Sequence, residues 1–159
     1  MPIDGKLLLC LEDGVYDYEP QTGEERAIAT LRLPRDHRLN DGKVSPEGRL
    51  WVGTIDTSDH PSETAGLFVL DDNNLELVES GYENANGKAW NADGTIMYHA
   101  DTARSVVAVP VPNPTSCTIV PGEPNILYIT TAYDGMDDDE RAKYPLAGAI
   151  FTADLSAIF

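Results

Sequence analysis

A turn followed by a short apolar strand occurs four times along the chain, and this repeat constrains the fold more than any other feature. The four copies are GKLLLCL from Gly5, EGRLWVGT from Glu47, DGTIMYHAD from Asp93 and PNILYITTA from Pro124. Their aligned positions are Leu7, Leu50, Ile96 and Ile126, which gives spacings of 43, 46 and 30 residues. Two of the three spacings match the length of one β-propeller blade.

Further strands surround each copy. A second apolar run follows each one: GVYDY from Gly14, GLFVL from Gly66, SVVAV from Ser105 and GAIFTAD from Gly148. A third run follows twice, as EERAIATL from Glu24 and NLELVES from Asn74, and an innermost strand precedes three copies, as GKVS, GKAWN and TSCTIV. Turn residues separate these runs. The pattern predicts an all-β chain of three to four four-stranded antiparallel blades, forming one partial β-propeller domain over residues 1–159.

The propeller expected from this pattern is incomplete. The spacing of 30 leaves no room for an outer strand after HADTARSVV, so the third unit is shortened. The first unit begins at its second strand, and the last stops at Phe159 without an outer strand. Open blade edges are templates for other strands. We therefore expect two chains to pair edge to edge as a homodimer, and a small closed ring of four units is the alternative.

Composition narrows the class of protein. The 159 residues are 42% hydrophobic, which is typical of a globular chain, and the net charge is −16. This charge repels a phosphate backbone and argues against nucleic-acid binding, while it attracts cations or simply keeps the protein soluble. Cys10 and Cys117 lie in apolar runs and are expected to be free thiols. No membrane span or signal peptide is visible, so a cytoplasmic location is expected.

One helix is expected, near the C-terminus. In DDDERAKY, Asp137 is followed three residues later by Glu140, which is the spacing of a capping box. The acidic run lacks the alternating ligands and the glycine of an EF-hand loop, so a short surface helix is the better interpretation.

Two long segments resemble a known family. RLNDGKVSPEGRLWVGT, residues 38–54, resembles the R-x-N-D-G-K-x-D-P-x-G-R-x-W-x-G-T segment of the gluconolactonase, regucalcin (senescence marker protein) and luciferin-regenerating-enzyme family. ENANGKAWNADGTIMYHADT from Glu83 is similar to its N-G-L-A-W-S-P-D-G-x-x-x-Y-x-x-D-[ST] segment. PVPNPTSCTI, LYITTAYDGM and PLAGAIF are similar to its last blade, so the resemblance runs from Gly5 to Ile150.

The resemblance implies a six-bladed propeller that binds one divalent cation, often calcium or zinc, and hydrolyses sugar lactones. Carried over by position, Asn86 matches a metal ligand. Arg38 and Asn40 match residues that hold substrate oxygens near the metal. No residue of this chain is assigned as the catalytic acid or base.

The chain departs from the family in two further metal ligands. One is a Glu near the N-terminus, in a blade that this chain does not have before Gly5. The other is the Asp of a P-D-G segment, in the stretch shortened between SVVAV and PVPNPTS; Asp134 resembles a different, last-blade motif. With one ligand of three recognisable, cation affinity is expected to be weak unless a partner chain supplies oxygen ligands.

The same residues have structural interpretations. Asn86 and Gly87 could form a tight turn, and Asn40, Asp41 and Gly42 a hairpin turn. Arg38 could form a surface ion pair with Asp36 or Asp41. Trp51 and Trp90 are expected to pack as core wedges between blades. His37, His60 and His99 share no metal-ligand spacing.

Two functions therefore stay open. The first is a metal-dependent lactone or ester hydrolase, in which Asn86 helps to hold the cation while Arg38 and Asn40 orient the substrate. The second is a non-catalytic propeller remnant that acts as a binding or assembly module. Loss of two ligands favours the second, and retention of the R-x-N-D and N-G segments favours the first.

Overall fold

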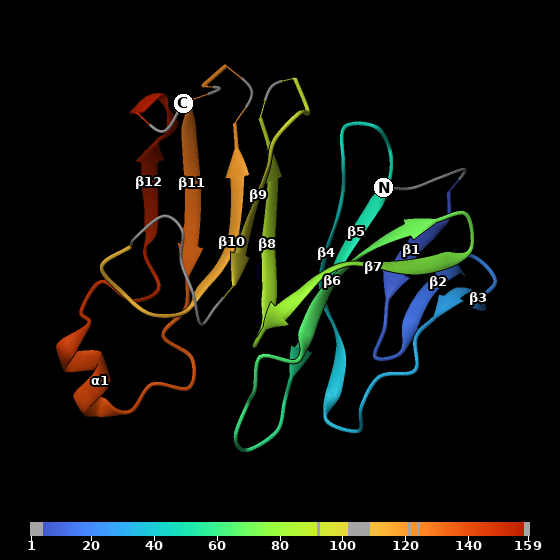
Figure 1. The fold of residues 1–159 in the computed structure, drawn as a ribbon, viewed down its shortest axis with the longest axis horizontal. Coiled ribbons are helices and arrows are strands. Elements are labelled where there is room, and N and C mark those ends of the chain that lie inside the picture. Colours follow the sequence, from blue (N-terminus) through green and yellow to red (C-terminus); the bar gives the residue numbers. More distant parts are fainter. Residues whose placement is uncertain (1–4, 92, 102–108, 121, 124, 158–159) are drawn as a thin grey trace. The chain divides into compact units, whose positions relative to one another are not determined.

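The structure, a computed structural model, describes residues 5–91, 93–101, 109–120, 122–123 and 125–157 and forms two compact units. Unit 1 is Met1–Ala85 and unit 2 is Asn86–Phe159. The strands shown in Figure 1 are β1 (Leu7–Cys10), β2 (Gly14–Glu19), β3 (Glu24–Thr30), β4 (His37–Val44), β5 (Leu50–Asp56), β6 (Ala65–Asp71), β7 (Asn74–Tyr82), β8 (Ala85–Trp90), β9 (Met97–Asp101), β10 (Pro114–Ile119), β11 (Ile126–Thr131) and β12 (Ile150–Asp154). Helix α1 spans Asp138–Lys143, and a 3-10 turn spans Leu155–Ala157.

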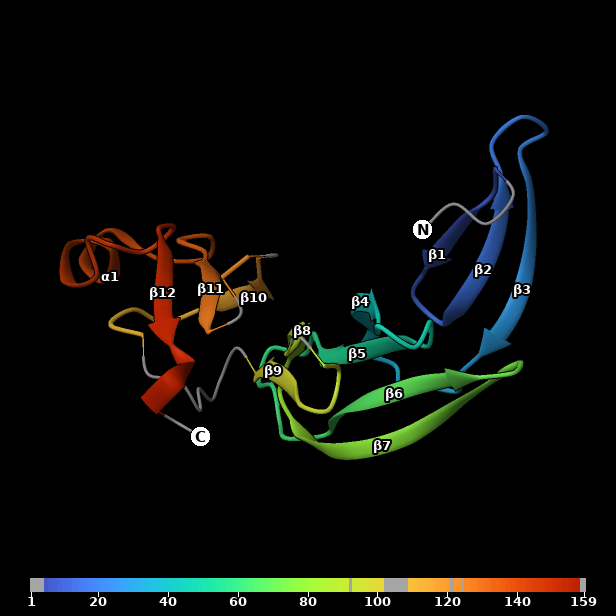
Figure 2. The ribbon, with the colours of Figure 1, turned by 90° about the horizontal axis from the view of Figure 1, so that it is seen from above.

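Unit 1 contains two antiparallel sheets, β1-β2-β3 and β4-β5-β6-β7. Figure 2 shows β6 and β7 as a long hairpin. Buried residues from both sheets form one core cluster, made of Val15, Ala29, Leu39, Leu50, Val52 and Leu75. The four-stranded sheet has the predicted blade order, with GKV inside the innermost strand β4 and NLELVES inside the outermost strand β7.

Unit 2 contains the sheets β8-β9 and β10-β11-β12, with a core of Ala89, Cys117, Leu127, Ile129 and Leu155. GKAW lies in β8 and TSCTI in β10, so both predicted inner strands are confirmed. The SVVAV run falls almost wholly outside the described residues. Helix α1 begins with the predicted capping box, because the Asp137 side chain accepts a hydrogen bond from Glu140 N and the Glu140 side chain accepts one from Asp137 N.

A buried threonine joins the second and third strands of a sheet in each unit. Thr54 Oγ1 of β5 accepts a hydrogen bond from Gly66 N at 2.8 Å, where β6 begins. Thr131 Oγ1 of β11 accepts one from Gly148 N at 3.1 Å and donates one to Ala149 O at 2.9 Å. The hydroxyl thus takes the place of a backbone partner where the two strands start to separate. The hydrogen bonds of this threonine are thus repeated in both units, as the strand pattern is in the sequence.

Gly53 allows the backbone of residue 85 to lie against β5. A Cβ at Gly53 would overlap the Ala85 carbonyl oxygen and would lie 2.7 Å from its carbonyl carbon. No flexible side chain can move aside there, because the obstacle is backbone. The glycine of the VGT segment is therefore required by a close approach of two chain segments within unit 1.

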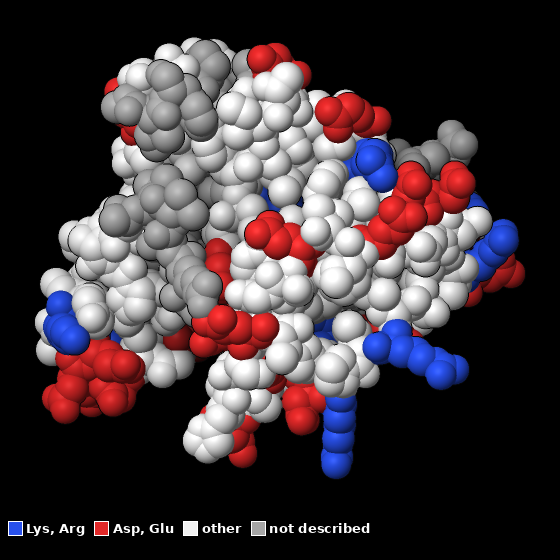
Figure 3. Space-filling model, viewed as in Figure 1, with Lys and Arg blue, Asp and Glu red and all other residues white. Residues whose placement is uncertain are grey.

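Several smaller expectations can be compared with the structure. Neither cysteine forms a disulfide bond, as predicted; Cys117 is buried and Cys10 half-buried. Trp51 and Trp90 are half-buried and belong to neither core cluster, so the expectation that they pack as core wedges is not supported. No helix in the described ranges is long and apolar enough to cross a membrane. On the face shown in Figure 3 the acidic groups outnumber the basic ones, in keeping with the negative net charge.

We expect Gly53→Ala to lower the free energy of unfolding by about 3 kcal/mol, because the added methyl group must displace backbone. The melting temperature should fall by roughly 6–12 °C, measured by circular dichroism. Val78→Ala on the exposed part of β7 is the control and should change the melting temperature little. A Gly53→Ala variant as stable as the wild type would contradict the close approach.

Candidate functional site

The polar residues before the LWVGT strand lie in a β-bulge of the innermost strand. Strand β4 pairs Leu39 with Thr54 and then Gly42 with Val52. Asn40 and Asp41 therefore stand opposite a single residue of β5, Gly53. A bulge of this kind redirects side chains out of the regular alternation of the strand. The alternative of a hairpin turn at Asn40–Gly42 is wrong, because these residues lie inside β4.

Two side chains of β4, Arg38 and Asn40, form a connected group with Asn84, which lies just before β8. This group is here named the Arg38–Asn40–Asn84 cluster. Arg38 Nη1 donates to Leu39 O at 3.0 Å and to Asn40 Oδ1 at 3.3 Å. Asn40 Nδ2 donates to Asn84 Oδ1 at 2.7 Å. The contacts of Arg38 are thus to a neighbouring carbonyl and an amide, and the guanidinium holds the amide of Asn40 in one orientation.

The chain segment before β8 brings Asn84 to this cluster. Ile55 and Asn84 form an isolated antiparallel bridge, and Asp56 N donates to Glu83 O at 3.0 Å. This pairing is possible because Gly53 leaves room for the backbone that follows at Ala85. The same close approach that closes unit 1 therefore positions the third member of the cluster.

The loop after β5 is held by Asp56, beside the start of β4. The Asp56 carboxylate accepts hydrogen bonds from Ser58 N at 3.0 Å, Ser62 N at 2.8 Å and Ser62 Oγ at 3.1 Å. These bonds hold the pKa of Asp56 far below its ordinary value, the Ser58 backbone being the largest cause. His37 pairs with Asp56 across the two strands, and its ring contacts Thr64 Oγ1 at 2.8 Å. The loop is thus fixed next to Arg38.

Asn86, the expected metal ligand, belongs to unit 2. It lies in β8 and is half-buried, so the alternative of a tight turn at Asn86–Gly87 is wrong. Its Oδ1 accepts a hydrogen bond from Gly87 N at 3.2 Å. Gly87 has a φ of +36°, and a Cβ there would lie 2.8 Å from Ser116 Cα of β10. Gly87 is thus required both by its backbone conformation and by the approach of β10.

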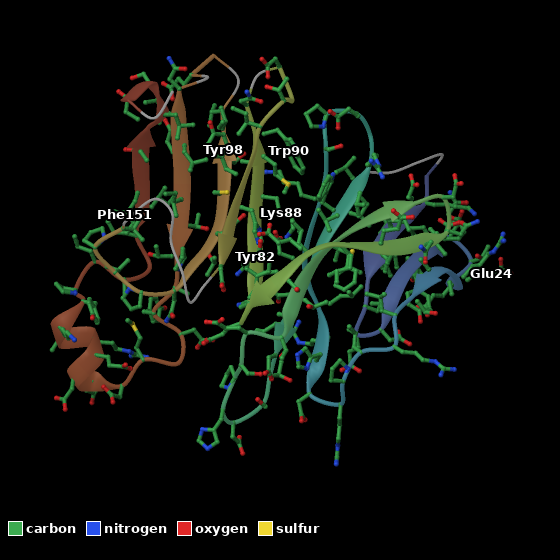
Figure 4. All side chains as sticks on the ribbon, viewed as in Figure 1. Glu24, Tyr82, Lys88, Trp90, Tyr98 and Phe151 are labelled. Carbon is green, nitrogen blue, oxygen red and sulfur yellow. The ribbon has the colours of Figure 1, made fainter. Side chains whose placement is uncertain are left out.

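Two charged residues in the described part of unit 2 are buried. Lys88 on β8, labelled in Figure 4, is fully buried. Asp101 at the end of β9 is 5% exposed. Between them in sequence lies His99, whose pKa is lowered by burial first and by the positive charge of Lys88 second. The backbone of Gly87 and Asn86 and the charge of Asp101 act on it in the opposite direction. Lys88, His99 and Asp101 each interact with another group of the chain.

The side chains of the described residues do not fit a divalent cation. A hard cation needs six to eight oxygen ligands, or about four nitrogen, sulfur and oxygen ligands in the case of zinc. Among the residues that the structure describes, no group of three or more His, Cys, Asp or Glu side chains could hold a metal ion. The Oδ1 of Asn86 is also engaged by its own backbone. We therefore derive no chemical step from a metal.

Sequence reasoning found Arg38 and Asn40 but missed Asn84, Asp56 and Lys88. Asn84 stands two positions before Asn86 in the ENANG run, and that repeated amide was an available signal. Asp56 follows an apolar strand and precedes Ser58, the pattern of a carboxylate that caps a loop. Nothing in the local pattern marks Lys88 as buried, because a lysine between glycine and alanine is typical of a surface strand.

The chain is similar in sequence to several known proteins. A family model described as SMP-30/Gluconolactonase/LRE-like region matches residues 1–108. The 6-deoxy-6-sulfogluconolactonase of Pseudomonas putida is 30% identical over 106 residues, which cover 65% of this chain and 36% of that enzyme. A Bacillus subtilis relative is 28% identical over 138 residues, covering 84% of this chain and 45% of the relative. The chain thus spans less than half the length of both.

A third relative bears on the shortened middle of the chain. Regucalcin of Xenopus laevis is 24% identical over 200 residues, covering 80% of this chain and 67% of regucalcin. A chain of 159 residues cannot fill an alignment of that length, so regucalcin has additional residues inside the matched region. This supports the interpretation that the chain is internally shortened.

Solved structures show the same fold. The calcium-binding protein regucalcin from Agrobacterium tumefaciens superimposes with a TM-score of 0.62 at 19% identity, over 94% of this chain and 72% of that one. A luciferin-regenerating enzyme superimposes with a TM-score of 0.65 at 21% identity, over 94% of this chain and 74% of that one. Both are six-bladed propeller structures, so the prediction of antiparallel propeller blades is confirmed at the level of the fold.

We expect Asp56→Asn to lower the melting temperature at pH 7. The melting temperature of the variant should also fall less steeply as the pH is lowered. Because the folded-state pKa of Asp56 is depressed, the stability that it contributes is present above the unfolded-state pKa of about 3.9. That contribution is lost as the pH falls toward the folded-state pKa. The difference between wild type and variant should therefore shrink below about pH 4, as followed by circular dichroism.

The control for this experiment is Asp59→Asn, an exposed change in the same loop. It should leave the acid dependence of the melting temperature as in the wild type. Equal acid dependence in the wild type and in Asp56→Asn would show that the Asp56 carboxylate does not anchor the loop.

Proposed function

Because the chain belongs to the SMP-30/gluconolactonase/LRE-like family, we propose that it acts on a sugar lactone as a carboxylic ester hydrolase. The Pseudomonas putida relative, which is named as a 6-deoxy-6-sulfogluconolactonase, supports the class of substrate. The observation that carries the proposal is the Arg38–Asn40–Asn84 cluster, which is built on the innermost strand of the complete blade.

The cluster offers the donors that a sugar lactone requires. Within the described part of the chain the hydrogen bonds of Arg38 are made by Nη1, so Nε and Nη2 are oriented to donate to ligand oxygens. The Arg38 side chain is exposed and permanently charged, and Asn40 is held by two neighbours. A ring oxygen, a hydroxyl or a carboxylate of a sugar acid would therefore meet preorganised donors.

Hydrolysis of a lactone adds water to the carbonyl carbon and breaks the bond between that carbon and the ring oxygen. Negative charge develops on the carbonyl oxygen in the transition state, and a fixed guanidinium is suited to stabilise it. In the proposed role Arg38 orients the lactone and Asn40 fixes the direction of its ring. No residue is assigned as the general base.

The second candidate is a non-catalytic binding module. The lack of a side-chain group suited to a metal, within the described ranges, favours it. A binding module would use the same cluster to hold the sugar acid without turning over the lactone. Binding without hydrolysis separates the two candidates.

The deciding assay follows δ-gluconolactone hydrolysis in a pH-stat, with spontaneous hydrolysis subtracted. We expect Arg38→Lys to lower kcat/KM by about 10- to 100-fold, because lysine keeps the charge but loses the planar pair of donors. Calorimetric binding of gluconate should weaken by a similar factor.

Arg49→Lys is the matched control for this substitution. Arg49 also lies in unit 1 and donates to a side chain, Asp71 Oδ1, at 3.2 Å. It should change kcat/KM less than twofold. Equal effects of the two substitutions would rule out Arg38 as a substrate-binding residue, and binding of gluconate without any turnover would favour the binding module.

Pairing of two copies is a separate proposal, made from the open blade edges. Strand β12 forms one edge of its sheet, and Ile150 on it is 66% exposed. Exposed apolar residues on an edge strand favour strand addition. Light scattering at micromolar concentration should give the mass of a dimer, and Ile150→Lys should raise the dissociation constant. A stable wild-type monomer would contradict this proposal.

A further inference from the structure

The hydrogen bonds of the Arg38–Asn40–Asn84 cluster all run in one direction. A guanidinium group can only donate, so the atom of Asn40 that faces Arg38 Nη1 at 3.3 Å is the carbonyl oxygen Oδ1. The Nδ2 group of Asn40 therefore lies on the other side of the amide, where it donates to Asn84 Oδ1 at 2.7 Å. Turning the Asn40 amide by half a rotation would place N–H groups against the guanidinium and one carbonyl oxygen against another. The two neighbours thus select one orientation of this amide.

The bond to Asn84 is the stronger of the two that hold the Asn40 amide. Its length of 2.7 Å lies at the short end of the usual range, whereas the 3.3 Å bond to Arg38 lies beyond the roughly 3.2 Å that is usual for N–H···O. The Arg38 side chain is also exposed, while Asn84 is half-buried. Without the Asn84 oxygen, one long bond to an exposed side chain would remain to orient Asn40.

The side chain of Asn84 is not needed to attach its own segment to the sheet. Ile55 and Asn84 already form an antiparallel bridge through their backbones. Asp56 N also donates to Glu83 O at 3.0 Å. The side-chain bond to Asn40 is additional to this backbone pairing. A substitution that removes it should therefore leave the segment before β8 in place.

A fixed amide distinguishes ligands that an amide free to turn does not. The side chain of Asn40 has a donor end and an acceptor end, and it is half-buried in the bulge of β4. If the amide can turn, the two ends exchange, and hydroxyl groups in different positions can each find a partner. If it cannot turn, a ligand with a hydroxyl in the wrong position leaves a polar group unpaired and is bound more weakly.

We propose that Asn84 is a specificity-determining residue that acts by positioning Asn40. By accepting the hydrogen bond from Asn40 Nδ2, it keeps the amide in one orientation and so lets the cluster discriminate between sugar acids, and their lactones, that differ in the configuration of a single hydroxyl group. Asn84 acts through Asn40 rather than on the ligand. This inference rests on the proposed function, because it takes Asn40 as a residue that contacts the sugar.

The test compares the calorimetric dissociation constants of gluconate and galactonate, which differ in configuration at C4 alone. We expect the wild-type chain to bind one of the two at least about tenfold more tightly. Asn84→Leu, which keeps the size of the side chain but has no acceptor, should reduce the ratio to less than about threefold. Asn84→Asp should keep the ratio within about twofold of the wild type, because a carboxylate oxygen still accepts from Asn40 Nδ2. Its added charge acts on both sugar acids alike.

The ratio is a readout that a merely structural role would not change, because a smaller fraction of folded protein affects both ligands equally. Asn74→Leu, an exposed change in unit 1, is the matched control and should leave the ratio unchanged. If Asn84→Leu fails to fold, Asn84→Ala removes the same acceptor with a smaller side chain and should likewise lower the ratio.

Three results would overturn the inference while leaving the proposed function intact. They are a wild-type chain that binds both acids equally, an unchanged ratio in the leucine and alanine variants of Asn84, and an Asn84→Asp variant that discriminates no better than these. A wild-type chain that binds neither acid and hydrolyses no δ-gluconolactone would instead contradict the proposed function, and this inference with it.

Discussion

The close approach of the Ala85 backbone to Gly53 is the constraint on which the rest of unit 1 depends. It allows the bridge between Ile55 and Asn84, and so brings the amide of Asn84 within 2.7 Å of Asn40. The bulge at Asn40 and Asp41 stands opposite the same glycine. The bulge in β4 and the close approach of the Ala85 backbone therefore both involve Gly53, a residue without a side chain.

Each unit buries charge and compensates it in a different way. In unit 1 the Asp56 carboxylate is satisfied by backbone N–H groups and a hydroxyl of its own loop, so the charge stabilises a loop rather than a pair of strands. In unit 2 the buried charged residues are of both signs, Lys88 and Asp101. Burial of ions is costly, so both arrangements restrict the conformations of the segments that carry them.

Much of the fold could be predicted from the sequence because strand repeats and turn residues are local signals. The inner strands, the capping box at Asp137 and the antiparallel blades follow from them. Asn40 and Asn86 could be named as candidates but not placed: a turn and a bulged strand use the same Asn, Asp and Gly residues, and only strand pairing distinguishes them. The burial of Lys88 could not be predicted, because it depends on contacts between segments rather than on its neighbours in the chain.

The central claim is that the family fold is kept here with guanidinium and amide groups, Arg38 and Asn40, held in one arrangement on the inner strand of unit 1. A crystal structure from crystals soaked in manganese, with anomalous data, tests it most directly. The account predicts an ordered hydrogen bond between Asn40 and Asn84 and no anomalous peak beside Asn86. An anomalous peak coordinated by Asn86, with Asn40 and Asn84 apart, would contradict it.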